Sequence, residues 1–255
     1  MQAMLNIAIQ AAISAGKLIC QHVDRLDQVK VKSKGRNDFV TEVDMVAERE
    51  IIYHIQKAHP DHAILAEESG QTDGNEYCWI IDPIDGTMNF MHGFPQFAVS
   101  IAVQHKNKIV AGVVYDPLSQ ELFTAIRGAG ARLNNRRIRV SKITKLQDAL
   151  VSTGFSNRNK DGLQTHMERV SNVFTQASGL RRSGSAALDL AFVAAGRLDA
   201  YWEAGLQPWD VAAGTLLVQE AGGIVTDFSG EHEPVYSKQC LAGAPRIHEA
   251  LLKIL

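Results

Sequence analysis

Two aspartates three residues apart, Asp82 and Asp85, are the side chains of this chain best placed to do chemistry. They lie in the run Asp-Pro-Ile-Asp-Gly-Thr at 82–87, where a proline stiffens the turn and a glycine and a hydroxyl follow. The apolar run at 77–81 leads into it and predicts a buried strand. Both carboxylates would therefore emerge where a strand ends. Hard oxygen ligands of this kind suit Mg²⁺, which keeps room for water and substrate phosphate.

Each acidic motif also has a plain structural explanation when it is taken alone. Asp-Pro and Asp-Gly are common in turns, because Asp caps its own backbone and Gly supplies positive φ. In that case Thr87 would be a turn hydroxyl. The segment Glu67-Glu68-Ser69-Gly70 follows a short apolar strand, so it is either an ordinary polar loop or a source of carboxylates at the end of a rigid element.

Two further acids lie where helices are predicted to begin. Asp210 is in the first turn of a helix over 208–220, where proline is favoured and an acid complements the helix dipole. Asp44 stands three residues after Thr41, which is the spacing of a capping box. Capping and catalysis would each explain Asp44, and the residues alone leave both open.

The elements that must position these residues follow from the hydrophobic pattern. Apolar residues at helical spacing predict helices, and alternating or short apolar runs predict strands. Predicted helices cover 4–23, 41–57, 163–176, 185–195, 208–220 and 248–255. Predicted strands cover 63–66, 97–104, 109–115, 121–126, 149–153, 198–203 and 223–227, and Lys30 to Asp38 is predicted to be a mobile loop. A strand meander followed by alternating units indicates a mixed α and β fold of layered sheets, with helices outside and between them.

Composition limits the class of protein. A chain of 255 residues with 45% hydrophobic content can bury one large core over 1–255, or two tightly joined halves of about 1–145 and 146–255. The 26 Lys and Arg residues nearly balance 28 Asp and Glu residues, so no overall field recruits nucleic acid or a membrane. The basic stretch 132–139 is predicted to be a solvated hairpin. Three widely spaced cysteines suit a reducing compartment and favour neither a disulfide framework nor a zinc site.

The N-terminal segment 4–23 predicts an amphipathic helix. Polar residues interrupt its apolar pattern, and no basic leader precedes it, so it does not resemble a signal peptide. No run is expected to be long enough to span a bilayer. We therefore expect a soluble, cytoplasmic protein without membrane partners.

Taken together, the motifs resemble the inositol monophosphatase family, within the larger group of metal- and lithium-sensitive sugar phosphatases. The resemblance rests on WIIDPIDGTMNFMH at 79–92, on WDVAAG at 209–214 with QEAGG at 219–223, and on Glu67-Glu68-Ser69. Segments 37–41, 184–190 and 194–197 are closest to the bacterial branch, one member of which also serves transcription antitermination. Met88 departs from a common second threonine, and Gln207 stands where a basic residue is expected in the bacterial branch.

The resemblance implies a layered α-β-α-β-α sandwich and a centre of two or three Mg²⁺ ions. Glu67, Asp82 and the carbonyl of Ile84 would hold one ion, and Asp82, Asp85 and Asp210 a second. Glu67 would also assist a third. It assigns catalytic roles to Asp44, Thr87 and Glu67, and substrate contacts to Asp85, Gly86, Thr87, Gly184, Ser185, Ala186, Glu203 and Asp210. Ser185 has the alternative role of a helix cap, and Glu203 that of an acid on the surface of an edge strand.

The implied reaction is hydrolysis of inositol-1-phosphate by direct attack of metal-activated water, with no phosphoenzyme. Histidinol phosphate, a sugar bisphosphate or an adenosine bisphosphate would be alternative substrates of the same chemistry. A different class is a partner of transcription antitermination factors or RNA polymerase, with incidental catalysis. The family also implies a homodimer. The sequence contains neither a nucleophile elbow nor a P-loop, so a serine hydrolase and a P-loop nucleotide triphosphatase are not supported.

Overall fold

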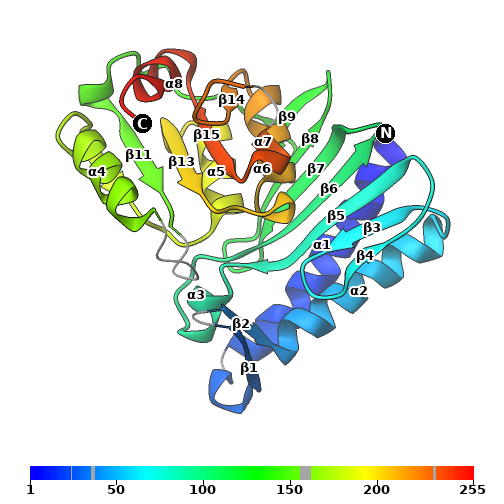
Figure 1. Ribbon diagram of the computed structural model, residues 1–255. Coiled ribbons are helices and arrows are strands. Elements are labelled where there is room, and N and C mark those ends of the chain that lie inside the picture. Colours follow the sequence, from blue (N-terminus) through cyan, green and yellow to red (C-terminus); the bar gives the residue numbers. More distant parts are fainter. Residues whose placement is uncertain (24, 36–37, 156–161, 232–233) are drawn as a thin grey trace.

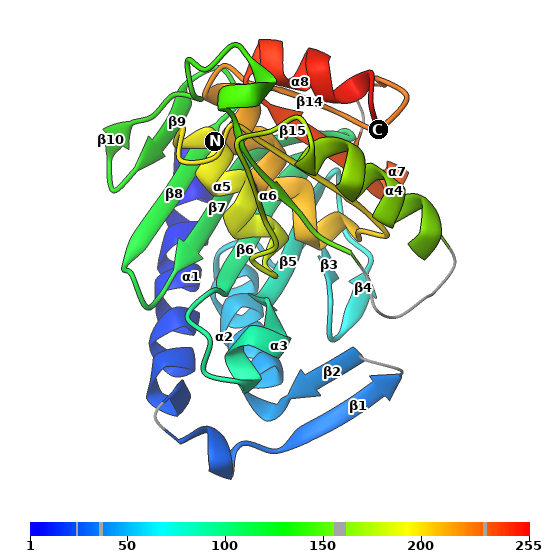
Figure 2. The same ribbon diagram turned by 90° about the vertical axis from the view of Figure 1, so that its left-hand side faces the viewer.

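The computed structural model describes residues 1–23, 25–35, 38–155, 162–231 and 234–255, and these form five stacked layers (Figure 1). One pair of helices covers the outer face of a large sheet, and a second pair lies between that sheet and a smaller one. Further helices cover the far face of the smaller sheet (Figure 2). The predicted α-β-α-β-α sandwich is confirmed.

The large sheet has eight strands in the order β10-β9-β8-β7-β6-β5-β3-β4. They are β3 Ala63–Ala66, β4 Gly70–Thr72, β5 Tyr77–Asp85, β6 Ala98–His105, β7 Lys108–Asp116, β8 Glu121–Ile126, β9 Gly130–Leu133 and β10 Arg136–Arg137. All neighbours are antiparallel except β3 and β5, which are parallel. The predicted meander is therefore β6-β7-β8, and the basic stretch is the predicted hairpin, β9-β10.

Helices α1 (Gln2–Val23) and α2 (Glu42–Ala58) cover one face of this sheet. The buried face of α1 is rich in alanine, including Ala8, Ala12 and Ala15, which lets the helix backbone approach the sheet closely. By length and composition α1 could cross a membrane, contrary to our expectation that no run is long enough. The core helix of a soluble protein can have the same length and apolar composition, and the apolar residues of α1 join the core under the large sheet.

The smaller sheet has five strands in the order β12-β11-β13-β15-β14. They are β11 Leu150–Thr153, β12 Gly179–Arg181, β13 Ala200–Ala204, β14 Ile224–Thr226 and β15 Gln239–Gly243. The helices α4 (Leu163–Phe174) and α8 (Pro245–Leu252) pack on its outer side. Three short helical segments, α3 (Thr87–Met91), α7 (Pro234–Ser237) and the 3-10 turn Leu146–Asp148, join the main elements, and another such turn, Leu26–Gln28, follows α1.

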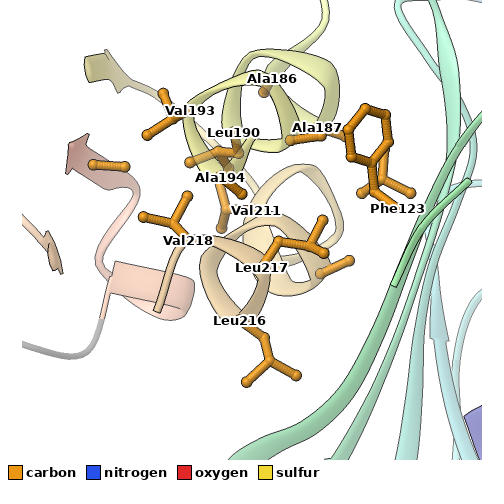
Figure 3. Close-up of a cluster of buried hydrophobic side chains, with 14 of the residues drawn as sticks. Phe123, Ala186, Ala187, Leu190, Val193, Ala194, Val211, Leu216, Leu217 and Val218 are labelled. Atoms are coloured by element: carbon orange, nitrogen blue, oxygen red, sulfur yellow. The ribbon is translucent and has the colours of Figure 1, made fainter. Parts of the chain in front are cut away.

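The middle layer consists of α5 (Ala186–Ala194) and α6 (Pro208–Glu220). Both helices are buried on nearly all sides, because each lies between the two sheets and has the other helix beside it. Leu190 on α5 lies beside Val211 on α6, and Phe123 reaches from β8 toward α5 (Figure 3). This apolar block fixes the first turns of α5 and α6, where the site residues Ala186 and Asp210 lie.

Several parts of the fold differ from the sequence prediction. Strands β4 and β12 were not predicted, and the last helix, predicted over 248–255, is Pro245–Leu252. The predicted mobile loop Lys30 to Asp38 includes strand β1 (Val31–Gly35) and the first residue of β2 (Asp38–Thr41), and the two strands pair in an antiparallel hairpin. Residues 36 and 37 of that segment lie outside the described residues. Strand β15 was not predicted, although it pairs with β13 on one side and β14 on the other. Its five residues show no alternation, so its place in the sheet depends on pairing with strands distant in sequence.

Candidate active site

An irregularity in β5 separates the two aspartates of the central motif. Asp82 is opposite Ser100 and Asp85 is opposite Ala98, so β5 carries one extra residue between them. Proline at position 83 has no N–H to give to the ladder, and a bulge is where a strand tolerates it. Because of this bulge, the carboxylates of Asp82 and Asp85 lie on the same side of the strand end. Asp82 Oδ1 also accepts the N–H of Ile84 at 3.0 Å, which fixes the turn.

Asp82, Asp85 and Asp210 converge at this point. Each offers a carboxylate oxygen, and these oxygens lie within 4.8 Å of one another. Asp210 comes from the first turn of α6, where its Oδ2 accepts the N–H of Gln207 at 2.7 Å. The predicted capping role of Asp210 is thus real, and it does not take the residue out of the cluster.

Glu67 joins the cluster from the loop after β3. Burial raises the pKa of Asp82 well above its usual range, and the charges of Glu67, Asp85 and Asp210 raise it further. Burial likewise raises the pKa of Asp210, with Asp85 and Glu67 adding to the effect. The negative charges of these four acids repel one another, and divalent cations would neutralise that repulsion. Hard carboxylate oxygens are the donors that Mg²⁺ prefers, so the donor set fits the expected ion.

Asp85 is held from the opposite side by the start of α5. Its Oδ2 accepts the hydroxyl of Ser185 at 2.6 Å and the N–H of Ala187 at 2.7 Å. Burial raises the pKa of Asp85 to about 6, although these two hydrogen bonds oppose the shift. Ser185 Oγ also accepts the N–H of Leu188, so Ser185 caps α5 and anchors Asp85 at once.

Asp44 and Thr87 form a second polar pair beside the cluster. Thr41 and Asp44 make the predicted capping box of α2, in which Asp44 Oδ2 accepts the N–H of Thr41 at 2.9 Å. The other oxygen of Asp44 lies 3.1 Å from the Thr87 hydroxyl, which is also 3.1 Å from the carbonyl oxygen of Ile84. Burial raises the pKa of Asp44, which is fully buried. The capping and catalytic roles of Asp44 are therefore compatible.

Gly86 links the acidic cluster to α3 and must be a glycine. Its φ is +98°, and a Cβ there would lie 2.8 Å from the carbonyl oxygen of Gln96 and 3.3 Å from that of Gly184. The turn at residues 85–87, where substrate contacts are expected, thus approaches the loop before α5 closely.

A cavity of about 370 Å³ opens from the cluster toward the smaller sheet. The residues expected to contact substrate that line it are Asp85, Gly184, Ser185, Ala186, Glu203 and Asp210. Glu203 is not an edge-strand acid, because β13 lies between β11 and β15. Its Oε2 accepts the hydroxyl of Tyr201 at 2.7 Å, and burial raises its pKa to about 7.

Two cavity residues were missed by the sequence analysis. Arg182 brings a cation into the otherwise acidic cavity, and its guanidinium lies 5.0 Å from the ring centre of Phe155. Asp189 accepts the hydroxyl of Ser183 at 2.6 Å, and burial raises its pKa to about 8. The available signal for Asp189 was a charged residue inside the apolar run of α5, and the sequence analysis did not use it.

Comparison with known proteins gives one consistent result. Residues 1–255 match the model of the inositol monophosphatase family. The chain is 51% identical to the Nus factor SuhB of Pseudomonas aeruginosa, over 99% of this chain and 95% of that protein. The crystal structure of extragenic suppressor protein suhB from Bartonella henselae is 44% identical with a TM-score of 0.96, over 99% and 98% of the two chains. An inositol monophosphatase from Anabaena is 39% identical with a TM-score of 0.90, over 99% and 95%.

Proposed function

The chain belongs to the inositol monophosphatase family, and we propose that it is a Mg²⁺-dependent phosphatase that hydrolyses inositol-1-phosphate. The observation that carries the proposal is the meeting of Asp82, Asp85 and Asp210 at the mouth of a polar cavity. Glu67 and the carbonyl of Ile84 would complete the ligands of two or three ions. Bound Mg²⁺ would neutralise phosphate oxygens, acidify the attacking water and stabilise the leaving oxygen.

The protein's own groups would orient water and remove its proton. Thr87 has one hydroxyl proton to donate, to Asp44 or to the Ile84 carbonyl, and its lone pairs remain available to a water molecule. The raised pKa of Asp44 makes it a better proton acceptor near neutral pH than an exposed aspartate. We assign the two residues to positioning the attacking water and taking up its proton.

The cavity supplies contacts for the alcohol part of the substrate. Asp85, Ser185 and Glu203 offer oxygen atoms that can accept or exchange hydrogen bonds with hydroxyl groups of a small polyol. Arg182 would contribute donors to an anionic or hydroxylated group. These groups suit a sugar-like alcohol better than a large apolar one.

The test is release of phosphate from inositol-1-phosphate by the metal-free protein, with and without added Mg²⁺. We expect turnover only with Mg²⁺ and inhibition by Li⁺ in the millimolar range. A panel with histidinol phosphate, a sugar bisphosphate and an adenosine bisphosphate determines substrate class. Faster turnover of one of these would reassign the substrate, and no phosphate release from any of them with Mg²⁺ would reject the enzyme.

A second role is favoured by the relative that carries the name Nus factor at 51% identity. We infer that the chain also binds components of a transcription antitermination complex, in the cytoplasm and as a homodimer. Capture of purified RNA polymerase and Nus factors by wild-type protein and by Asp82→Asn tests this. Equal capture by both proteins would show a role separable from catalysis, and no capture by either would reject it.

A further inference from the structure

A second cavity, of about 260 Å³, lies far from the acidic cluster. It is bounded by the end of β6, the start of β7, the residue after β8, the second half of α6 and α7. Gln104, which lines it, is opposite Cys78 near the start of β5, whereas Ser100 is opposite Asp82. Gln104 and Ser100 are four residues apart on β6, which corresponds to about 13 Å along the strand.

Two buried polar side chains line this second cavity with hydrogen-bonding capacity to spare. Thr215 on α6 is 3% exposed, and among the described residues its hydroxyl has no hydrogen-bond partner. Gln104 is 8% exposed, and its Oε1 accepts the hydroxyl of Tyr236 at 3.1 Å. Within the part of the chain that the structure describes, the two N–H donors of the Gln104 amide form no hydrogen bond. A buried hydroxyl without a partner is costly, so a ligand that bonds to it would remove a penalty.

Two cations stand at the rim of the same cavity. Arg127 gives its Nε–H to the carbonyl of Ile109 at 2.6 Å, which fixes the guanidinium, and its terminal N–H groups form no hydrogen bond to the described residues. Within the described ranges, neither Arg127 nor Lys108 forms an ion pair. Glu220 lies next in sequence to Gln219 in the wall, and both its oxygens accept backbone N–H groups, of Gly128 and Gly130, at 2.7 Å.

We propose that this cavity is a second binding site, for the phosphate group of a small molecule. Lys108 and Arg127 would pair with the phosphate, and the Thr215 hydroxyl and the Gln104 amide would donate to its oxygens. Arginine provides a planar fork that matches phosphate geometry, and lysine adds a point charge. Donors outnumber acceptors among these groups, which selects an anion over a cation or a neutral polyol.

Equilibrium dialysis of metal-free protein with radiolabelled inorganic phosphate tests the site. Without a cation, the acidic cluster repels phosphate, so saturable binding reports the second cavity. We expect binding of one equivalent, weakened at least about tenfold by Lys108→Gln with Arg127→Gln. Thr215→Val should weaken binding several-fold while leaving the melting temperature unchanged or higher, because valine has nearly the same shape and no unpaired hydroxyl.

Two control variants show whether the phosphate binds in this cavity. Lys142→Gln with Lys145→Gln removes the same charge from exposed positions outside the cavity and should leave the affinity unchanged. Arg182→Gln, in the first cavity, should also bind phosphate as the wild type does. Absence of saturation up to about 10 mM phosphate would overturn the proposal. So would equal affinity in the Lys108 and Arg127 double variant, or loss of binding in the Arg182 variant.

Discussion

At the scale of single residues, acids of the candidate site also have structural roles. Asp210 caps a helix through one oxygen, and Asp44 completes a capping box while it contacts Thr87. Asp85 is anchored by the first turn of α5. Capping therefore fixes where each carboxylate lies, since a helix start is a rigid place from which to project a short side chain.

The variant Asp82→Asn should remove activity while keeping the fold. Loss of a ligand of the proposed Mg²⁺ centre would cost several kcal/mol of transition-state stabilisation, or about a thousandfold in rate. The metal-free protein should become more stable near neutral pH, because one of several mutually repelling buried charges is gone. Phosphate release and thermal unfolding measure the two effects. Asp148→Asn, at an exposed position, is the control, and wild-type turnover in Asp82→Asn would contradict the assigned role.

Thr87 offers a test of the hydroxyl itself. Thr87→Val keeps the size of the side chain and removes the group that contacts Asp44, so kcat should fall about 10²- to 10⁴-fold with little change in KM. Thr87→Ser restores a hydroxyl and should recover most of the rate. If valine and serine variants were equally slow, packing rather than the hydroxyl would be responsible.

At the scale of elements, α5 and α6 approach one another closely at Gly214. A Cβ on Gly214 of α6 would lie 2.5 Å from Cβ of Leu190 on α5. Gly214→Ala should therefore destabilise the protein by about 1–3 kcal/mol through overpacking. Helix propensity alone predicts the opposite sign, a gain of about 1 kcal/mol.

Denaturant unfolding of Gly214→Ala decides between these signs. Ser171→Ala, at an exposed position of α4, is the matched control and should be neutral or slightly stabilising, because only propensity acts there. A stabilised Gly214→Ala protein would mean that the two helices can separate at little cost.

The sequence predicted those helices and strands whose characteristic residue pattern lies within the segment itself. The helix over 208–220 was predicted with its observed bounds, because proline at its start and a buried apolar run are signals within the segment itself. Strand β15 was missed because nothing within its five residues distinguishes it from a loop. The hairpin β1-β2 was missed because the charged residues and the glycine of its segment are typical of a loop.

The candidate site was predicted unevenly for the same reason. The acids at 67, 82, 85 and 210 belong to long motifs, and each follows or begins a predictable element. Arg182 lies in a short connection between β12 and α5, and its place in the cavity depends on how the two sheets meet. Side chains brought together only by the stacking of layers carry no signal within their own segments.

At the scale of the whole molecule, the site lies between the two sheets. Asp82 and Asp85 come from β5 of the large sheet, Asp210 from the middle layer, and Glu203 from β13 of the smaller sheet. Cations bound by the cluster would therefore hold the layers together, and the loss of those cations would weaken the contact between them. Folding stability and metal binding should be linked through the protonation of these acids.

The sign of that linkage follows from the direction of the pKa shifts. Folding raises the pKa of Asp85 to about 6, of Glu203 to about 7 and of Asp189 to about 8. These three carboxyl groups stabilise the folded state fully below their pKa values in the unfolded chain, which are about 4. That stabilisation is lost as the pH rises through their folded-state pKa values, up to about 8. His62 and His166 act in the opposite direction below about pH 6.5, because burial lowers their pKa.

The histidines contribute equally with and without Mg²⁺, so their contribution drops out of the difference in stability between the two conditions at one pH. We expect the stabilisation gained on adding Mg²⁺ to be larger near pH 8 than near pH 5.5, because protons compete for the same carboxylates at the lower pH. At a concentration of 100 times its Kd, Mg²⁺ would add about 2.7 kcal/mol, or roughly 5–10 °C in Tm. Calorimetry at both pH values measures the gain, and Asp82→Asn with Asp210→Asn should abolish it. An equal gain at both pH values would mean that Mg²⁺ stabilises the protein at groups other than these acids.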